Sequence, residues 1–205
     1  MDTEVVDQPK DTIIALLDDR REEALVTLRA VDFDALVQMR NVARSRVWGA
    51  DGVANASRSI VVRAPRQNPK RADVRATFAR DRYTCRYAHC RQPTVHPDVL
   101  RLLSAAFPEV VPYHRNWRPL ESHILYWTYS TSVEHVISFP SGGTSGAENL
   151  ITACYLCNDV KNCLPLDLLH WTVGPPAQST WLGLTEYVSS LKKLVDPSRL
   201  SPRNG

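Results

Sequence analysis

The sequence predicts an α+β protein in which a short strand region and the helix after it carry a polar site, with helical regions on either side. Residues 133–137 are rich in β-branched side chains and precede Pro140 and a turn-rich loop, which is typical of a strand end. Between residues 154 and 162, cysteines and polar residues recur at three- and four-residue spacings, which a helix brings onto neighbouring positions. Amphipathic patterns towards both ends of the chain predict the flanking helices.

The composition indicates a globular protein with an uneven charge distribution. Of 205 residues, 43% are hydrophobic and 23% are charged, which is enough apolar material for a core. The net charge of +3 does not by itself indicate a nucleic-acid partner. Acids dominate the first 35 residues, however, and residues 58–91 are rich in arginine, which favours a nucleic-acid surface in that stretch. Because the sequence has no membrane-length apolar run and no signal-peptide pattern, we expect a cytoplasmic protein without membrane contact.

The first 63 residues are expected to form a helical region. An amphipathic helix over 11–29 and a second over 32–47 would pack as a hairpin, followed by a short strand over 59–63. Residues 64–79 are expected to be a basic linker and a lead-in helix, because the prolines resist helix formation and the charges resist burial.

Six arginines in and after this linker are candidates for binding DNA. A guanidinium bonds two phosphate oxygens at once, which makes arginine the usual phosphate ligand. The six are Arg71, Arg75, Arg80, Arg82, Arg86 and Arg91. The alternative for such a series is a solvated helix face.

Five cysteines in an intracellular chain favour a metal site over disulfides. Four of them form two short pairs more than sixty residues apart, Cys85 with Cys90 and Cys154 with Cys157. Two such pairs predict a structural zinc site that ties the start of the central domain to its helix. Cys163 is left over as a small buried residue, and His89, inside the first pair, is an alternative ligand.

The central domain is expected to span residues 80–164, with an insertion at 97–129. Residues 99–107 predict a short helix within the insertion. The stretch from His123 to Tyr129 is β-rich, and we expect it to pair with the strand that carries His135. The histidines and tryptophans of the insertion, among them His114, Trp117, His123 and Trp127, are expected to be core residues, and a second metal or base-stacking site is the alternative.

The C-terminal extension is expected to cover residues 165–196. Its prolines prevent one continuous helix, and a closing helix over 181–194 would pack its leucines against the core. Residues 197–205 are expected to be a disordered tail.

The polar residues of the central stretch predict a site for phosphodiester hydrolysis. Glu134 offers a carboxylate and Asn158 an amide oxygen, which are the hard ligands that Mg²⁺ or Mn²⁺ prefers. His135 can take a proton from water, and Lys161 can meet a phosphate.

At these residues the sequence resembles the HNH endonucleases, also called ββα-metal or His-Me finger nucleases, in their zinc-stapled four-cysteine form. The resemblance covers about residues 80–164 and rests on motifs in a fixed order. They are Tyr83-Thr-Cys85-x₄-Cys90, Glu134-His135-Val-Ile, Gly142-Gly143, Asn149-Leu150 and Cys154-x₂-Cys157-Asn158-x₂-Lys161. The resemblance implies a ββα-metal nuclease core with a structural Cys₄ zinc site.

The resemblance also implies a role for each site residue. His135 is expected to be the general base, and Glu134 and Asn158 to hold one catalytic Mg²⁺ or Mn²⁺. Asn149 is expected to orient the histidine through the backbone, and Lys161 to contact phosphate.

Three features depart from the family's usual pattern. The acid before the base is more often Asp or His than Glu, and four residues rather than two separate the first pair of cysteines. Asn162 stands where the family often has glycine, and it is a further candidate for contact with the metal or a phosphate.

The expected function is therefore that of a metal-dependent endonuclease that cleaves DNA, related to restriction or phage defence. One alternative is a zinc-stapled DNA- or protein-binding module whose nuclease site has decayed. Another is a nuclease subunit regulated by a partner protein, which the acidic, apolar N-terminal helices suggest. Since one HNH site cuts one strand at a time, double-strand cleavage would favour a homodimer.

Overall fold

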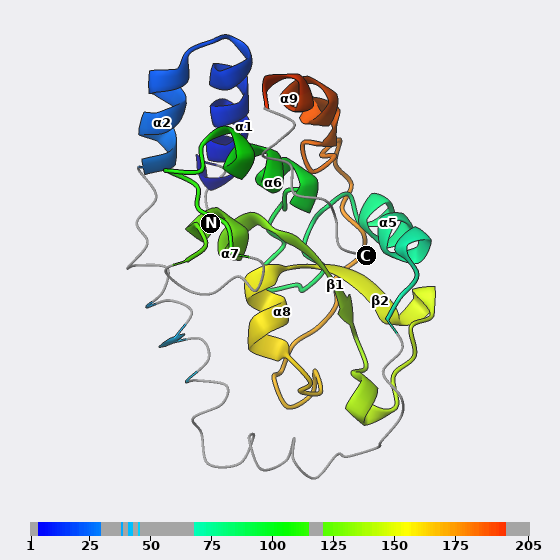
Figure 1. The fold of residues 1–205 in the computed structure, drawn as a ribbon. Coiled ribbons are helices and arrows are strands. Elements are labelled where there is room, and N and C mark those ends of the chain that lie inside the picture. Colours follow the sequence, from blue (N-terminus) through cyan, green and yellow to red (C-terminus); the bar gives the residue numbers. More distant parts are fainter. Residues whose placement is uncertain are drawn as a thin grey trace. The chain divides into compact units, whose positions relative to one another are not determined.

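A computed structural model describes residues 4–29, 38, 41, 42, 45, 68–114 and 121–195. These residues form helices and a small two-stranded antiparallel sheet, which confirms the α+β class (Figure 1). Most of the expected second helix, the expected strand at 59–63, the start of the linker and the tail at 197–205 lie outside the described residues. Within the described ranges, none of the helices has the length and apolar character needed to span a bilayer.

The chain divides into two compact units. The helical unit comprises Met1–Phe33, Val95–Ser130 and Leu184–Gly205, and the sheet unit comprises Asp34–Thr94 and Thr131–Gly183. The stretch at 97–129, expected as an insertion in the central domain, thus groups with the chain's two ends.

The helical unit differs from the sequence prediction in three places. Its described elements are α1 (Glu4–Leu17), α2 (Arg21–Arg29), α6 (Pro97–Ala106), α7 (Ile124–Tyr129), a 3₁₀ turn η3 (Thr185–Tyr187) and α9 (Val188–Leu194). The prediction of a single helix over 11–29 is wrong, because the chain turns at Asp19 between α1 and α2, where the backbone has a left-handed φ of 58°. The expected closing helix at 181–194 is helical only from Thr185 onward. The short helix expected at 99–107 is confirmed as α6.

The strand expected from His123 to Tyr129 is also wrong, because these residues form the helix α7. The Nδ1 atom of His123 accepts a hydrogen bond from the backbone N–H of Leu125 at 3.3 Å, which caps the helix at its start. Five of the six residues of α7 are buried. Capping and burial therefore outweigh the β-propensity of this aromatic stretch.

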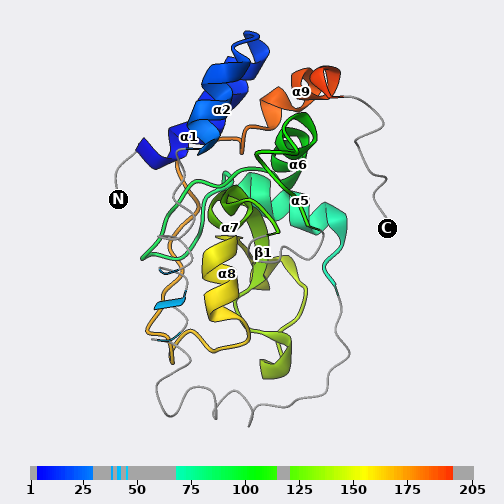
Figure 2. The ribbon, with the colours of Figure 1, turned by 60° about the vertical axis from the view of Figure 1, so that its left-hand side comes forward.

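The sheet unit has the strand–strand–helix order that the resemblance implies, but its second strand, residues 150–154, was not predicted from the residue pattern. Its described elements are α5 (Arg71–Arg80), β1 (Thr131–His135), the 3₁₀ turns η1 (Phe139–Ser141) and η2 (Ala147–Asn149), β2 (Leu150–Cys154) and α8 (Tyr155–Lys161). The strands are antiparallel, with Thr131 opposite Cys154 and His135 opposite Leu150. Helix α8 contacts both strands, and it lies beside them in Figures 1 and 2.

Helix α8 begins later than the change of pattern near Asn149 suggests. Residues 150–154 form a fully buried strand first, so only the second cysteine of the pair is helical. Cys154 is the N-cap of α8, and its Sγ accepts the backbone N–H of Cys157 at 3.4 Å. The two thiols therefore lie at the junction of strand and helix.

One buried carboxylate joins α5 to strand β2. Asp81 is fully buried and accepts hydrogen bonds from Arg80 Nε at 2.9 Å and Arg86 Nη1 at 2.6 Å. It also accepts the backbone N–H of Thr152, in β2, at 2.8 Å. Burial alone would raise the pKa of Asp81, but the hydrogen bonds from Arg80, Thr152 and Arg86 hold it below its ordinary value.

Replacing this carboxylate should destabilise the sheet unit. In Asp81→Asn the two guanidiniums lose their buried counter-charge, so we expect the free energy of unfolding to fall by about 3–5 kcal/mol in urea titrations. Asp167→Asn, at an exposed position, is the matched control and should change it by less than about 0.5 kcal/mol. Because the folded pKa lies below 3.8, the stability that Asp81 contributes is present above that pH. The difference in the free energy of unfolding between wild type and Asp81→Asn should therefore shrink as the pH falls below 3.8. A difference that does not change with pH would contradict this account.

Candidate active site

The four cysteines of the two predicted pairs come together in the sheet unit. The Sγ atoms of Cys85, Cys90, Cys154 and Cys157 all lie within 4.8 Å of one another. A tetrahedral zinc with bonds of about 2.3 Å to sulfur requires sulfur atoms about 3.8 Å apart. Cys90 and Cys154 are 3.8 Å apart, so the cluster fits a zinc ion. Cys163 is half-buried and is not part of this group.

Local hydrogen bonds shape the first cysteine pair. The backbone N–H of Cys85 donates to the carbonyl of Gln92 at 2.8 Å, and that of Cys90 donates to the carbonyl of Tyr87 at 3.0 Å. These two bonds close residues 85–92 into a loop that turns both thiols towards the start of α8.

The crowding of the thiols favours a cation. Hydrogen bonds from the other three thiols, Cys154 first, lower the pKa of Cys90, and hydrogen bonds from Cys154, Cys85 and Cys90 raise the pKa of Cys157. Because neighbouring thiolates repel one another, four sulfur atoms this close together ionise together only when a positive charge is present. A divalent cation supplies that charge and allows all four sulfurs to become ligands.

His135 lies at the end of strand β1, as the sequence predicts. Its imidazole is half-buried, its Nε2 is 3.3 Å from Ser145 Oγ, and its ring centroid is 4.5 Å from that of Phe139. The ring is thus held on one side by an aromatic face and on another by a hydroxyl. An imidazole that is oriented in this way and still reached by water can act as a base.

Asn149 holds the loop that follows His135. Its Oδ1 accepts the backbone N–H of Ile137 at 2.8 Å, and its Nδ2 donates to the carbonyls of Ile137 at 2.9 Å and Thr144 at 2.7 Å. Gly143 is required in the same loop, because a Cβ there would lie 1.7 Å from the Ile137 carbonyl oxygen. The buried amide therefore holds the backbone two residues after His135 from both sides.

Lys161 is buried inside the site. The side chain has no exposed surface, and Nζ donates to Glu134 Oε1 at 2.9 Å and to the carbonyl of His135 at 2.8 Å. Burial raises the pKa of Glu134 to about 7, against the opposing effect of the Lys161 ammonium. The lysine expected to meet phosphate thus joins α8 to the Glu134-His135 pair, because a buried carboxylate attracts the nearest cation.

Asn158 projects from α8 towards the same strand, and Asn162 does not. Asn158 Nδ2 donates to the carbonyl of Val133 at 3.2 Å, which leaves the amide oxygen for another partner. The donors of Asn158 and Glu134 fit a hard divalent cation in kind, although the carboxylate also serves Lys161. Asn162 is exposed past the end of α8, with a left-handed φ of 49°.

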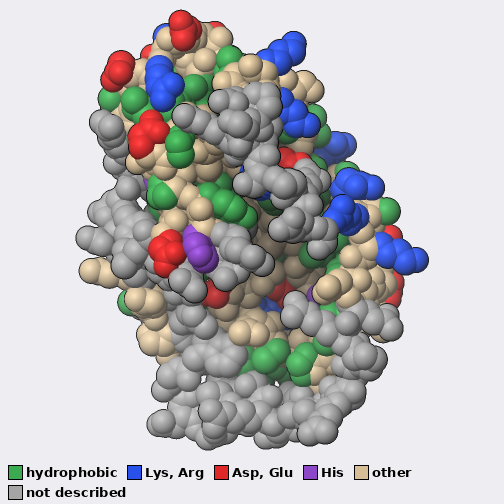
Figure 3. Space-filling view, in the orientation of Figure 1, with side chains coloured by type: hydrophobic (Ala, Val, Ile, Leu, Met, Phe, Trp, Pro, Cys, Tyr) green, Lys and Arg blue, Asp and Glu red, His purple; other side chains and the backbone are tan. Residues whose placement is uncertain are grey.

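The six candidate arginines divide into two groups of three. Arg71, Arg75 and Arg82 are exposed, and Figure 3 shows basic side chains over helix α5. The other three donate to backbone carbonyls, Arg80 to Leu150, Arg86 to Gly174 and Arg91 to Pro175, each at 2.7 Å. The second group is therefore built into the fold.

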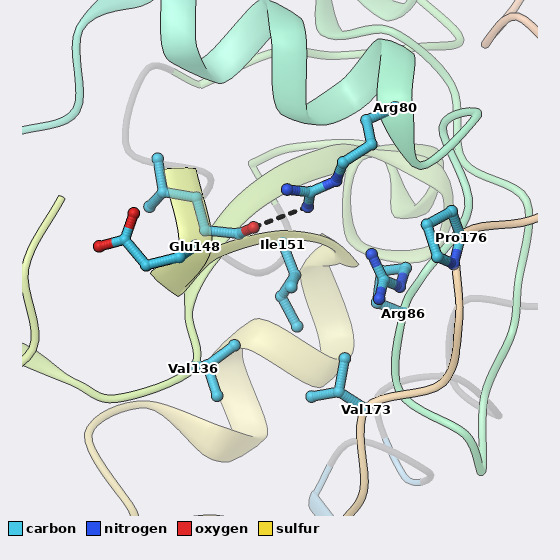
Figure 4. Close-up of a pocket in the computed structure, with 8 residues that line it drawn as sticks. Arg80, Arg86, Val136, Glu148, Ile151, Val173 and Pro176 are labelled. Carbon is cyan, nitrogen blue, oxygen red and sulfur yellow. Dashed lines mark hydrogen bonds between the residues drawn. The ribbon is translucent and has the colours of Figure 1, made fainter. Parts of the chain in front are cut away.

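Arg80 and Arg86 also line a cavity of about 430 Å³ beside strand β2 (Figure 4). Its other lining residues are Val136, Glu148, Leu150, Ile151, Val173 and Pro176. Both guanidiniums are bound to Asp81, so they are fixed parts of the cavity wall.

Sequence reasoning missed a segment that covers the cysteine loop. Residues 171–175, here called the strap, run beside residues 86–91. Tyr87 and Val173 form an antiparallel bridge, and the backbone N–H of Ala88 donates to the Thr172 carbonyl at 2.9 Å. No local spacing signals this pairing, because more than eighty residues separate the two segments.

Residues 117–163 match the family model described as HNH endonuclease. The match includes β1, the loop held by Asn149, β2 and α8, although it covers less than a quarter of the chain. The chain therefore contains an HNH domain. Comparisons with curated proteins and with solved structures gave no match.

The buried pair of Glu134 and Lys161 can be tested by a double-mutant cycle. Lys161→Met leaves a buried carboxylate without a counter-charge, so we expect a loss of about 3–5 kcal/mol in the free energy of unfolding. The double variant with Glu134→Gln removes both charges and should recover part of that loss. Lys70→Met, at an exposed position, is the control for losing a lysine. Strictly additive losses in the cycle would show that the two side chains do not interact.

Proposed function

We propose that this protein is a metal-dependent endonuclease that hydrolyses DNA phosphodiester bonds. The observation that carries the proposal is the arrangement of His135 at the end of β1, with Asn149 holding the following loop and Asn158 reaching β1 from α8. The match of this segment to the HNH endonucleases supports it. Members of that family are generally nucleases, which supports the proposed chemistry, and the geometry supports the proposed residue roles.

In the proposed reaction, His135 takes a proton from a water molecule. The water oxygen forms a bond to phosphorus while the bond from phosphorus to the 3′ oxygen breaks. The leaving 3′ oxygen takes a proton from solvent, which yields a 3′ hydroxyl and a 5′ phosphate. Phe139 and Ser145 hold the imidazole ring during this transfer, and Lys161 holds the His135 carbonyl.

Two metal ions complete the proposal. A Mg²⁺ or Mn²⁺ held by Glu134 and Asn158 would supply positive charge at the phosphate. A zinc held by the four cysteines would stabilise the fold without taking part in the chemistry. Arg71, Arg75 and Arg82 are proposed to bind the DNA backbone, because they are exposed, whereas the guanidiniums of Arg80, Arg86 and Arg91 already donate to backbone carbonyls.

The biological setting proposed for this activity is restriction or phage defence. A single site would cut one strand, so double-strand breaks would need a homodimer, and a regulatory partner protein remains part of the proposal. Copurification at native expression levels tests the partner, and a free monomer that is fully active would argue against it.

The first activity test is cleavage of supercoiled plasmid DNA by the zinc-loaded protein with EDTA, Mg²⁺ or Mn²⁺. We expect cleavage that depends on the divalent metal, and a fall in rate of about 10²–10⁴-fold in His135→Ala, because a general base contributes about that much. His170→Ala, which removes an exposed histidine, is the control. If His135→Ala cuts as fast as wild type, the assignment of the base is wrong. If the folded wild type cuts no DNA but binds it, the binding-module alternative is favoured.

The role of Asn149 is separable from that of His135. In Asn149→Ala the Ile137 backbone loses both of its bonds to the side chain, so the cleavage rate should fall by about 10²-fold through misplacement of the base. DNA affinity, measured by fluorescence anisotropy without divalent metal, should not change. Asn149→Asp keeps an acceptor for the Ile137 N–H, so its cleavage rate should lie between those of wild type and Asn149→Ala. Equal losses of affinity and rate would instead indicate that Asn149 contacts DNA.

A further inference from the structure

His89 lies beside the four-cysteine cluster without belonging to it. The group of mutually close metal-ligating atoms contains the four cysteine sulfurs and not the imidazole. Yet His89 Nε2 is 3.7 Å from the Sγ of Cys157, within hydrogen-bonding reach for sulfur. The imidazole therefore contacts one ligand of the metal rather than the metal itself.

The chemistry of a metal-bound cysteine decides the direction of this hydrogen bond. A thiolate that binds zinc has lost its proton, so its sulfur can only accept. His89 must then carry its hydrogen on Nε2 and donate it to Cys157. Donors of this kind around a metal site withdraw charge from the ligand and hold it in place, and their removal weakens metal binding.

The imidazole is held in position by two aromatic rings. Its centroid is 4.3 Å from that of Trp171 and 5.9 Å from that of Tyr87, and the Tyr87 ring is nearly parallel, at 17°. Tyr87 is fully buried in the hydrophobic cluster that contains Cys85, Cys154 and Cys157. His89 is an exposed residue whose ring rests against Trp171 of the strap, and Trp171 in turn contacts Tyr87 in the core of the cysteine site.

The strap is fastened along its length, so Trp171 is a firm support. The Gly174 backbone N–H donates to the Arg86 carbonyl at 2.7 Å, and Arg86 Nε returns a bond to the Gly174 carbonyl at 2.7 Å. At the strap's far end, Arg91 Nη1 donates to the carbonyl of Pro175 at 2.7 Å. These bonds and the bridge between Tyr87 and Val173 hold the strap against the loop that contains His89.

We propose that His89 is an outer member of the zinc site, which donates its Nε2–H to the Cys157 thiolate and slows the loss of zinc. Trp171 and the strap fix the imidazole in the donating orientation. The inference rests on the zinc assignment in the proposed function, and it is independent of nuclease activity.

The test is the rate at which zinc leaves the full-length protein in an excess of a chromogenic chelator. His89→Phe keeps an aromatic ring for Trp171 and removes the donor, so we expect zinc release about 10-fold faster than wild type with the same zinc content. His89→Gln keeps an N–H donor, so its rate of zinc release should lie between those of wild type and His89→Phe. His170→Asn is the matched control, since it removes an exposed histidine that directly precedes the strap, and it should release zinc at the wild-type rate.

A spectroscopic measurement separates the donor from simple packing. In the cobalt(II)-loaded protein, His89→Phe should shift the thiolate-to-metal charge-transfer band, and His89→Gln should shift it less. Wild-type release and spectrum in His89→Phe would overturn the inference, as would equal effects in His89→Phe and His89→Gln. A wild-type protein that binds no zinc would overturn both this inference and the zinc assignment. Absence of DNA cleavage by a zinc-loaded protein would leave the inference intact and affect the nuclease proposal alone.

Discussion

The candidate site depends on how the short helix α8 is held, because a helix of seven residues is not stable in water on its own hydrogen bonds. Three side chains attach α8 to the rest of the sheet unit. Cys157 joins the four-thiol cluster, Asn158 bonds the carbonyl of Val133, and Lys161 bonds Glu134 and the carbonyl of His135. The residues of α8 that carry the resemblance to the HNH endonucleases therefore also keep the helix in place.

The candidate site therefore depends on the pairing of buried charges as well as on its candidate catalytic groups. Glu134 is a proposed metal ligand and is also the counter-ion of a fully buried lysine. A divalent cation near this carboxylate would share it with the ammonium, so metal binding and the stability of the β1–α8 contact are linked in this arrangement. Asp81 is a buried counter-ion of the same kind, since it neutralises Arg80 and Arg86, but it has no proposed part in the chemistry.

Local sequence patterns predicted the parts of the fold that local geometry controls. Cysteine spacing, the β-branched run before Pro140 and the glycine-rich loop are short-range signals, and the cluster, strand β1 and the loop held by Asn149 follow them. The prediction failed where burial competed with propensity. Residues 124–129 have strand-forming side chains, but a histidine cap and five buried side chains make them helical.

The sequence alone determined the identity and order of the candidate site residues, namely four thiols, an acid next to a histidine and two asparagines, and thereby the HNH resemblance. Only the tertiary structure decided the partner of each charged side chain. Lys161 binds Glu134, and Arg80 and Arg86 bind Asp81, whereas Arg71 and Arg75 stay exposed. The physical reason is that a buried charge must find its counter-charge through space, across separations in sequence that no local pattern records.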